Sequence, residues 1–256
     1  FEVYAPDVVC CQNVGKYPGE WWHMRGMERP LVGFCSYAAD TKDLRGYDLV
    51  LTSFPWYVDE LKAEGINADY LPLCFQRSVL TRAAAPSRDI AVSFVGGLGG
   101  RIWSQGQDAI DRLATAVDGF RWWGYKNGTC GNTLEMCYGG SAWGLRYYEL
   151  LMRSRISVNR HGDIARGYAN NLRLFEATGC GSCLVTEHAP NIGEFFEPGV
   201  ECMTYRSSSE LIDVVRWLMA NPDDCYKIAA AGQKRTLAEH CYEHRVNDFL
   251  RLVEAL

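Results

Sequence analysis

The sequence has no basic block and no long apolar run. Its 26 Lys and Arg residues are outnumbered by 31 Asp and Glu residues, and the formal net charge is −5. Its arginines are scattered singly, which argues against a general nucleic-acid binder, because no row of cations could neutralise a row of phosphates. No apolar segment approaches the length that crosses a bilayer, and no signal-like segment opens the chain. We therefore expect a globular protein without a transmembrane segment and without a nucleic-acid partner.

The sequence also lacks a full set of cysteines and histidines at the spacing of a metal site. The eleven cysteines include the pair Cys180 and Cys183, but no second cysteine pair and no histidine pair accompanies it at ligand spacing. A metal or redox role for this pair is the alternative. Cys35, Cys74 and Cys202 lie, like this pair, in or beside apolar strand-like runs, which favours buried thiols over a disulfide lattice. Buried, reduced thiols indicate a reducing compartment, so we expect a cytoplasmic location.

The first part of the chain alternates short apolar runs with helical or loop material. The runs are DVVCCQ after Pro6, LVGFCS from Leu31, YDLVLTS from Tyr47 and ADYLPL from Ala68. Short, partly β-branched runs are typical of strands in a covered parallel sheet. Four strands make a thin Rossmann-like sheet. We therefore predict a truncated N-terminal domain at residues 1–84, with further sequence or domains upstream of Phe1.

A polar segment from Arg82 to Asp89 has no periodicity and is predicted to link this domain to a second one at residues 85–240. The second domain opens with strand Ile90–Val95. That strand runs straight into Gly96, Gly97, Gly99, Gly100 and Arg101. Glycines let the backbone approach a ligand closely, and an arginine can pair with a phosphate. The spacing is not GxGxxG, so a phosphate-binding loop and a plain strand-to-helix turn are equal alternatives.

Two segments between the strands of the second domain carry less pattern. The glycine-rich stretch at residues 127–144 is predicted to be a surface loop that folds over a substrate. Ser207 and Glu210 form a capping box that predicts a helix start. A last helix at residues 241–256 is expected to pack back toward the N-terminal domain.

The stretch from Arg155 to Glu187 reads as strand, polar loop, short helix and second strand. Its first strand ends in a burst of polar and small residues: Asn159, Arg160, His161, Gly162 and Asp163. In an α/β fold, ligands bind beyond the carboxyl ends of the strands, and a helix that starts there offers free N–H groups to an anion. This stretch is therefore the predicted site.

The expected strand order brings this stretch next to the glycine loop. In a doubly wound second domain, the strands at Ile90 and Ile156 are neighbours at the point where the strand order reverses, provided that a short strand lies near Met136. The loops at residues 96–101 and 159–173 then face each other across the crevice in which such folds bind nucleotides.

At Asn171 the chain reads Asn-x-Arg-x-Phe-Glu-Ala, followed by a small, glycine-containing turn and an apolar strand. This pattern resembles the CgeB-like (spore-maturation protein) glycosyltransferases, which have the GT-B architecture. The resemblance continues through NIGEFFEPGVECMTY and NPDDCYKIAAAG to HCYEHRVNDFL, and covers roughly the last hundred residues. It implies an α/β fold in which two Rossmann-like, doubly wound domains face a cleft.

The resemblance also implies an activity. A sugar would pass from a nucleotide-sugar donor of the UDP or GDP type, held by the C-terminal domain, to a glycan, protein or small-molecule acceptor on the N-terminal domain. In related GT-B enzymes the glutamate at the Glu176 position hydrogen-bonds the donor ribose. Many of them carry a Glu-x7-Glu pair, but Tyr168 stands at the earlier position here. Asn159, His161, Asp163 or Asn171 is then expected to contact the sugar.

No Asp-x-Asp metal motif occurs in the sequence. The charge that develops on a nucleoside diphosphate leaving group can instead be stabilised by arginines and helix N-termini. Arg101, Arg166 and Arg173 could do this, so we predict a metal-independent enzyme without a cofactor. The predicted nucleotide-sugar-binding residues are Gly96, Gly97, Arg101, Asn159, His161, Asp163, Arg166, Asn171, Arg173 and Glu176.

The catalytic base is the least defined part of this prediction. An inverting transfer needs an Asp, Glu or His beside the acceptor hydroxyl, and Asp40, His161 and His23 are the candidates. Structural alternatives stand beside these roles. Glu176 could only cap its helix or pair with Arg173, and His161 could be an ordinary loop histidine. Tryptophans such as Trp143 could stack on a sugar or simply pack.

Two other classes of function are compatible with the sequence. A non-catalytic GT-B-like module could hold a nucleotide or glycan within a larger assembly, which the thin first domain and the missing first glutamate would favour. A sugar-nucleotide epimerase or a phosphorylase with similar architecture is the third alternative. Slow hydrolysis of a nucleotide sugar would distinguish an enzyme from a binding module.

Overall fold

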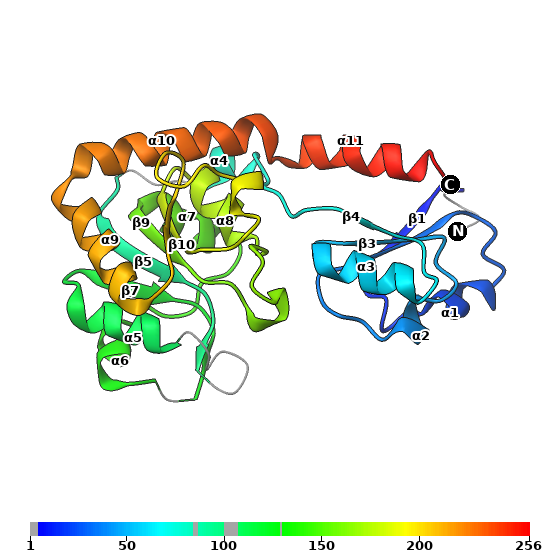
Figure 1. Cartoon of the computed structure of the whole chain (residues 1–256), viewed down its shortest axis with the longest axis horizontal. Helices are drawn as coiled ribbons and strands as arrows, with labels where there is room; N and C mark the ends of the chain where they lie inside the picture. The colour runs from blue at the N-terminus through cyan, green and yellow to red at the C-terminus, as the bar shows by residue number, and fades with distance from the viewer. Residues whose placement is uncertain (1–4, 84–86, 100–106, 129) are drawn as a thin grey trace. The chain divides into compact units, whose positions relative to one another are not determined.

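The computed structural model describes residues 5–83, 87–99, 107–128 and 130–256. The chain divides into two compact units (Figure 1). The first unit comprises the residues up to Leu73 together with Glu243–Leu256, and the second comprises Cys74–Tyr242. The short helix α4 (Val79–Arg82) therefore lies in the second unit, whereas the sequence placed the domain boundary at residue 84.

The first unit is built on a parallel sheet whose strand order is β1-β2-β3-β4. The strands are β1 (Val9–Cys11), β2 (Leu31–Cys35), β3 (Leu49–Thr52) and β4 (Ala68–Tyr70), and the helices between them are α1 (Gly19–His23), α2 (Thr41–Leu44) and α3 (Pro55–Ala63). Within the described residues the order runs in one direction, so right-handed crossovers put α1, α2 and α3 on one face.

The last helix covers part of this first sheet. Helix α11 (Tyr242–Val253) packs Phe249, Leu252 and Val253 against Val32, Leu49 and Leu51. Leu49 and Leu51 alternate with Val50 along β3, and alternate residues of a strand point to opposite faces. The chain thus returns to its first unit after completing the second.

The second unit contains a five-stranded parallel sheet of order β11-β10-β9-β5-β7. Its strands are β5 (Ile90–Val95), β7 (Phe120–Trp123), β9 (Ser154–Asn159), β10 (Cys183–Glu187) and β11 (Met203–Tyr205). Strands β5 and β9 pair directly, with Val92 opposite Ile156 and Phe94 opposite Val158. This pairing confirms the predicted reversal of strand order. In open α/β sheets the ligand crevice lies at such a reversal, here at the carboxyl ends of β5 and β9.

Helices cover both faces of this sheet (Figure 1). One layer includes α5 (Gln107–Ala116), α6 (Asn132–Cys137) and α9 (Ser208–Ala220), whose Leu113, Leu134 and Val215 join the main core of buried side chains. The helices α7 (Leu145–Arg153), α8 (Arg173–Gly179) and α10 (Pro222–Glu239) pack on one another. Strands β9 and β10 are buried along almost their whole length because helices lie over both of their faces, although only Ile156 and Val158 of β9 are apolar.

The prediction of a strand near Met136 is wrong. Residues Asn132–Cys137 form helix α6, and the extended pairing expected there is reduced to a single bridge between Trp122 and Tyr138. The strand order predicted from it still holds, because the chain crosses back to β9 through α7 whether or not a full strand intervenes.

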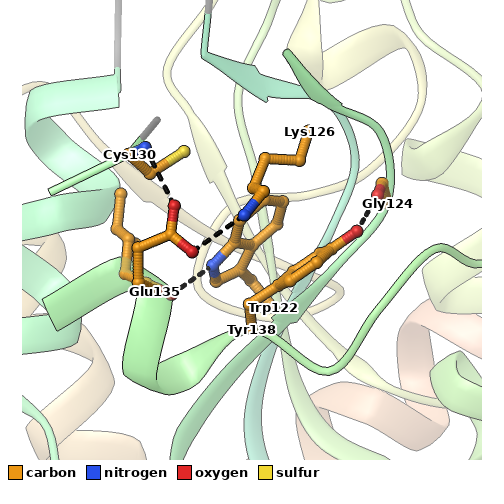
Figure 2. A network of polar contacts seen from close by, with 7 residues as sticks. Trp122, Gly124, Lys126, Cys130, Glu135 and Tyr138 are labelled. Carbon is orange, nitrogen blue, oxygen red and sulfur yellow. Dashed lines mark hydrogen bonds and ion pairs between the residues drawn. The ribbon is translucent and has the colours of Figure 1, made fainter. Parts of the chain in front are cut away.

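The segment predicted to be a patternless surface loop is fastened to the sheet (Figure 2). The indole Nε1 of Trp122 donates to the carbonyl of Leu134 at 2.7 Å, and Lys126 Nζ lies 2.8 Å from Glu135 Oε2. The Tyr138 hydroxyl donates to the carbonyl of Gly124 at 3.1 Å. The small parallel pair β6 (Leu98–Gly99) and β8 (Lys126–Asn127) ties the same segment to the loop after β5.

The thiols of the chain are mostly buried. All eleven cysteines are free; Cys10 is exposed and Cys137 is partly buried, while the other nine are buried. Burial raises the pKa of the Cys180 thiol well above the ordinary range, and the hydrogen bond with Cys225 together with burial does the same for Cys183. Across the described ranges, no group of three His, Cys, Asp or Glu side chains is placed to hold a metal ion. None of the helices in those ranges is long and apolar enough to span a membrane.

Candidate nucleotide-binding site

A hollow of about 440 Å³ lies at the carboxyl ends of β5 and β7, under the starts of α7 and α8. We call it the tyrosine hollow. It is lined by Val95, Gly96, Gly97, Gly124, Tyr125, Ala142, Trp143, Gly144, Tyr147, Tyr148, Arg173 and Glu176. Four of the predicted site residues are among these: Gly96, Gly97, Arg173 and Glu176. The hollow adjoins the point where the strand order reverses, because the end of β5 lines it and Arg173 bonds Asn159 at the end of β9. Such a reversal is the usual ligand position in open α/β sheets.

Glu176 is the buried acid of the tyrosine hollow. Its side chain is 9% exposed, and its two carboxylate oxygens accept hydrogen bonds from two tyrosines. The Tyr147 hydroxyl donates to Oε2 at 2.6 Å, and the Tyr148 hydroxyl donates to Oε1 at 3.0 Å. Burial raises the pKa of Glu176, and the two tyrosines and Arg173 oppose that shift. Glu176 therefore does more than cap its own helix.

Arg173 joins the glycine loop to the polar loop after β9. Its Nη1 donates to Asn159 Oδ1 at 2.9 Å, and its guanidinium carbon lies 5.0 Å from the centre of the Phe94 ring. A Cβ on Gly96 would lie only 2.3 Å from Arg173 Nη2, so the guanidinium occupies the space that a side chain at residue 96 would need. This contact confirms that the two predicted loops face each other.

Asn159 and Asn171 hold the polar loop from inside the protein. Asn159 is fully buried, and its Nδ2 donates to Thr186 Oγ1 at 2.9 Å. Asn171 Nδ2 donates to Asn159 Oδ1 at 2.9 Å and to the Arg160 carbonyl at 2.8 Å. Both side-chain amides are thus engaged in hydrogen bonds within the protein. They position Arg173 rather than face the tyrosine hollow.

A second hollow, of about 490 Å³, lies at the carboxyl ends of β10 and β11. We call it the histidine hollow. It is lined by Asp108, Ala109, His161, Gly162, Asp163, Gly167, Glu187, His188, Tyr205, Arg206, Ser207 and Ser208. The predicted site residues His161 and Asp163 belong to this hollow, so the polar burst after β9 is divided between two places.

His161 is buried and bonded to Glu187 at the end of the neighbouring strand β10. Its backbone N–H donates to Glu187 Oε2 at 2.5 Å, and its Nε2 lies 3.1 Å from the Glu187 carbonyl. Its Nδ1 is buried and has no hydrogen-bond partner. Burial lowers the pKa of His161 to about 4, and the charges of Arg173 and Arg160 add to this effect. A neutral ring enclosed in this way favours a structural role over that of a catalytic base.

The remaining predicted binding residues in the described ranges, Asp163 and Arg166, are exposed, and of these Asp163 lines the histidine hollow. Asp163 is exposed, with one carboxylate oxygen 4.0 Å from Arg160 Nη2. Arg166 is exposed and holds a left-handed backbone with φ 49°. Arg101, together with Gly100, lies outside the described residues.

Asp40 belongs to the first unit and caps helix α2. Its Oδ1 accepts from the Lys42 backbone N–H at 3.1 Å, and Lys42 Nζ lies 2.8 Å from Oδ2. These bonds to Lys42 lower the pKa of Asp40. A lowered pKa is unfavourable for a general base near neutral pH, so a capping role explains Asp40 better. His23, in the same unit, places its Nε2 2.7 Å from the Gly46 carbonyl.

Sequence reasoning missed the aromatic lining of the tyrosine hollow. No motif in the sequence singles out Tyr125, Tyr147 or Tyr148. Tyr125 is 54% exposed and Trp143 is 71% exposed, although both line the hollow. A large exposed aromatic beside glycines is the signal that could have indicated a stacking surface.

The tyrosine hollow combines three kinds of recognition. Exposed aromatic rings offer a flat surface, Arg173 offers a cation, and Glu176 offers two acceptor oxygens held by phenol hydroxyls. Ligand sites of this kind pair an apolar lining with a few directed polar groups. A nucleoside diphosphate has a flat base, a diol and an anionic diphosphate, which match these three groups.

Several solved structures have this fold at low sequence identity. The HepE protein of Anabaena, solved with UDP-glucose, aligns with a TM-score of 0.72 and 14% identity over 98% of this chain and 79% of that chain. Sucrose-phosphate synthase of Thermosynechococcus elongatus aligns with a TM-score of 0.66 and 12% identity, covering 98% and 74%. The pneumococcal O-GlcNAc transferase GtfA, solved with UDP and GlcNAc, aligns with a TM-score of 0.59 and 11% identity, covering 97% and 56%.

Sequence comparison gives the family. No curated protein matches the chain. The glycosyl transferase-like family matches residues 91–251, which include almost all of the second unit's sheet and both hollows. The chain therefore belongs to the glycosyl transferase-like family, and it is a glycosyltransferase of the GT-B type.

Proposed function

We propose that this glycosyltransferase takes its sugar from a UDP-sugar and binds the nucleotide in the tyrosine hollow. The observation that carries the proposal is the placement of Glu176 and Arg173 in one hollow at the reversal of strand order. The UDP bound in the HepE and GtfA structures supports uridine as the base. We also propose that, within its family, this chain is related to the CgeB-like glycosyltransferases.

The three parts of the nucleotide have separate partners in this arrangement. The ribose hydroxyls donate to the carboxylate of Glu176, as the family resemblance implies. The diphosphate lies against the guanidinium of Arg173, which packs on Gly96, and against the backbone of the neighbouring Gly97. The base lies against the exposed rings of Tyr125 and Trp143.

We further propose that the transfer needs no metal. Arg173 carries the charge that faces the leaving diphosphate, and the start of α8 adds the positive end of a helix dipole. The acceptor, which the N-terminal unit of a GT-B enzyme would bind, is a glycan, a protein or a small molecule.

Two measurements test this function. Calorimetric titration with UDP, GDP and ADP should give the tightest binding for UDP, and UDP-sugars should be hydrolysed slowly in the absence of acceptor. Hydrolysis should continue in excess EDTA. Absence of UDP binding would overturn the site. Loss of hydrolysis in EDTA, with recovery on addition of Mn²⁺, would overturn metal independence while leaving the nucleotide site in place.

A further inference from the structure

Two neighbouring tyrosines of α7 hold one carboxylate of α8 from different sides. The Tyr147 hydroxyl bonds Oε2 of Glu176, and the Tyr148 hydroxyl bonds Oε1. Consecutive residues of a helix point about 100° apart, which follows from 3.6 residues per turn. The two rings meet edge to face at 88°, with their centres 5.2 Å apart. This geometry fixes both the position and the plane of the carboxylate.

The chemistry of the donors leaves the carboxylate able to bind a ligand. A carboxylate has about four acceptor sites, and two phenol hydroxyls occupy two of them. Phenols are neutral, so they leave the charge of Glu176 in place, whereas a bidentate arginine would neutralise it. Glu176 and both tyrosines line the tyrosine hollow, where each oxygen retains acceptor capacity.

We propose that Tyr147 and Tyr148 are positioning residues that orient Glu176 to receive a vicinal diol, and that they make the site selective for ribonucleotides over deoxyribonucleotides. This inference rests on the proposed function, in which the diol is the ribose 2′- and 3′-hydroxyl pair. Two adjacent hydroxyls can donate one to each carboxylate oxygen only when the carboxylate plane is held. Freed from one tyrosine, the carboxylate can rotate and lose one of the two bonds.

The charged and titratable groups around Glu176 are few. Burial raises the pKa of Glu176, and the charge of Arg173 on the same helix opposes that rise. Burial and the interaction with Glu176 raise the pKa of Tyr147 and Tyr148. Burial and the charge of Glu176 also raise the pKa of Cys180, at the end of the same helix, and of Tyr242, at the start of α11. Among these neighbours, Tyr147 and Tyr148 are the residues whose hydroxyls donate to Glu176.

The test compares UDP with 2′-deoxyuridine diphosphate by calorimetry in the full chain. The wild type should bind the deoxy compound about tenfold more weakly, since it loses one hydrogen bond to a charged group. Tyr147→Phe and Tyr148→Phe should each weaken the binding of UDP but barely change the binding of the deoxy compound. The ratio of the two dissociation constants should therefore fall toward one. Tyr226→Phe, on an exposed residue of α10, is the control and should keep the wild-type ratio.

A pH series gives a second readout. Removing one phenol donor raises the pKa of Glu176 further, so UDP binding should fail at a higher pH in Tyr147→Phe than in the wild type. An unchanged ratio in both phenylalanine variants, with UDP still bound by the wild type, would overturn this inference alone. A wild type that binds no UDP would overturn the proposed function and this inference with it.

Discussion

Two hollows of similar size open at the carboxyl edge of the same sheet, about 440 Å³ at the tyrosine hollow and about 490 Å³ at the histidine hollow. In the tyrosine hollow, Glu176 and Arg173 are held by groups that leave part of their bonding capacity facing the space. In the histidine hollow, His161 and Glu187 are bonded to each other. The number of polar residues is therefore a poor guide to a site.

What differs is where the protein uses its own hydrogen bonds. A buried polar group that is bonded to another buried or half-buried group of the protein stabilises the fold and offers less to a ligand. A charged group held by neutral donors remains available, because its charge is not cancelled. By this criterion we propose the tyrosine hollow as the ligand site and assign the histidine hollow a structural role. Four predictions test this contrast.

The largest effect is expected from His161. Its pKa falls from 6.5 in the unfolded chain to about 4 in the folded protein. A depressed histidine pKa adds stability above pH 6.5, and that stability is lost as the pH falls toward 4. The difference corresponds to about 3 kcal/mol. Relative to His161→Gln, the wild type should lose about this much unfolding free energy between pH 7 and pH 4, measured by urea denaturation.

His188→Gln is the matched control for this titration, because His188 lines the same hollow with an exposed side chain. This variant should follow the wild type across the pH range. UDP affinity at pH 7 should be unchanged in both histidine variants. A large loss of UDP affinity in His161→Gln would make the histidine hollow part of the binding site and would remove the contrast.

The second effect concerns glycines, one at each hollow. An alanine Cβ at Gly96 would lie 2.3 Å from Arg173 Nη2, whereas one at Gly162 would meet only Ile164, at 3.8 Å. Neither glycine has a positive φ, so the two substitutions differ only in space. Gly96→Ala should displace Arg173 and weaken UDP by about 30-fold, as expected for a lost charged hydrogen bond of about 2 kcal/mol. Gly162→Ala should change the affinity for UDP by less than about twofold. Equal effects in a binding titration would contradict the assignment of Arg173.

The sequence predicted the layout of the site better than its chemistry. The pairing of β5 with β9 and the approach of the Gly96 loop to Arg173 follow from α/β periodicity and strand-order rules, which need only the pattern of apolar runs. The role of Tyr147 and Tyr148 could not be read in this way. Their hydroxyls meet Glu176 across 29 and 28 residues of sequence, and only the packing of α7 on α8 brings them together.

Two other departures have similar causes. A short helix stands near Met136 where a strand was expected, because six residues carry too little periodicity to separate the two. Asp40 looked like a strand-end acid, but the same position is also the N-cap of α2, and Asp is favoured in both settings. A single carboxylate in a sequence does not reveal whether its bonds go to the protein or to a ligand.

The third effect separates the two buried acids. Burial raises the pKa of Glu176 and of Glu187. A raised carboxyl pKa gives stability that is present below pH 4.5 and is lost as the pH rises through the folded-state value. Glu176→Gln and Glu187→Gln should therefore both lessen the fall in unfolding free energy with rising pH. Only Glu176→Gln should weaken UDP, by about tenfold. Weaker UDP binding in both variants would show that the two hollows act as one site.

The smallest effect is expected at the ion pair between Lys126 and Glu135, which supports the wall of the tyrosine hollow (Figure 2). Both side chains are about one-third exposed, and such pairs contribute below about 1 kcal/mol. The wall is also held by backbone bonds, since Gly124 N–H donates to the Gly140 carbonyl at 3.1 Å and Leu98 N–H to the Tyr125 carbonyl at 3.0 Å. A double-mutant cycle of Lys126→Met and Glu135→Gln should thus give a small coupling energy that shrinks in high salt. UDP affinity should change far less than in Gly96→Ala. A loss as large as in that variant would mean that this ion pair, rather than the backbone, places Tyr125 against the nucleotide.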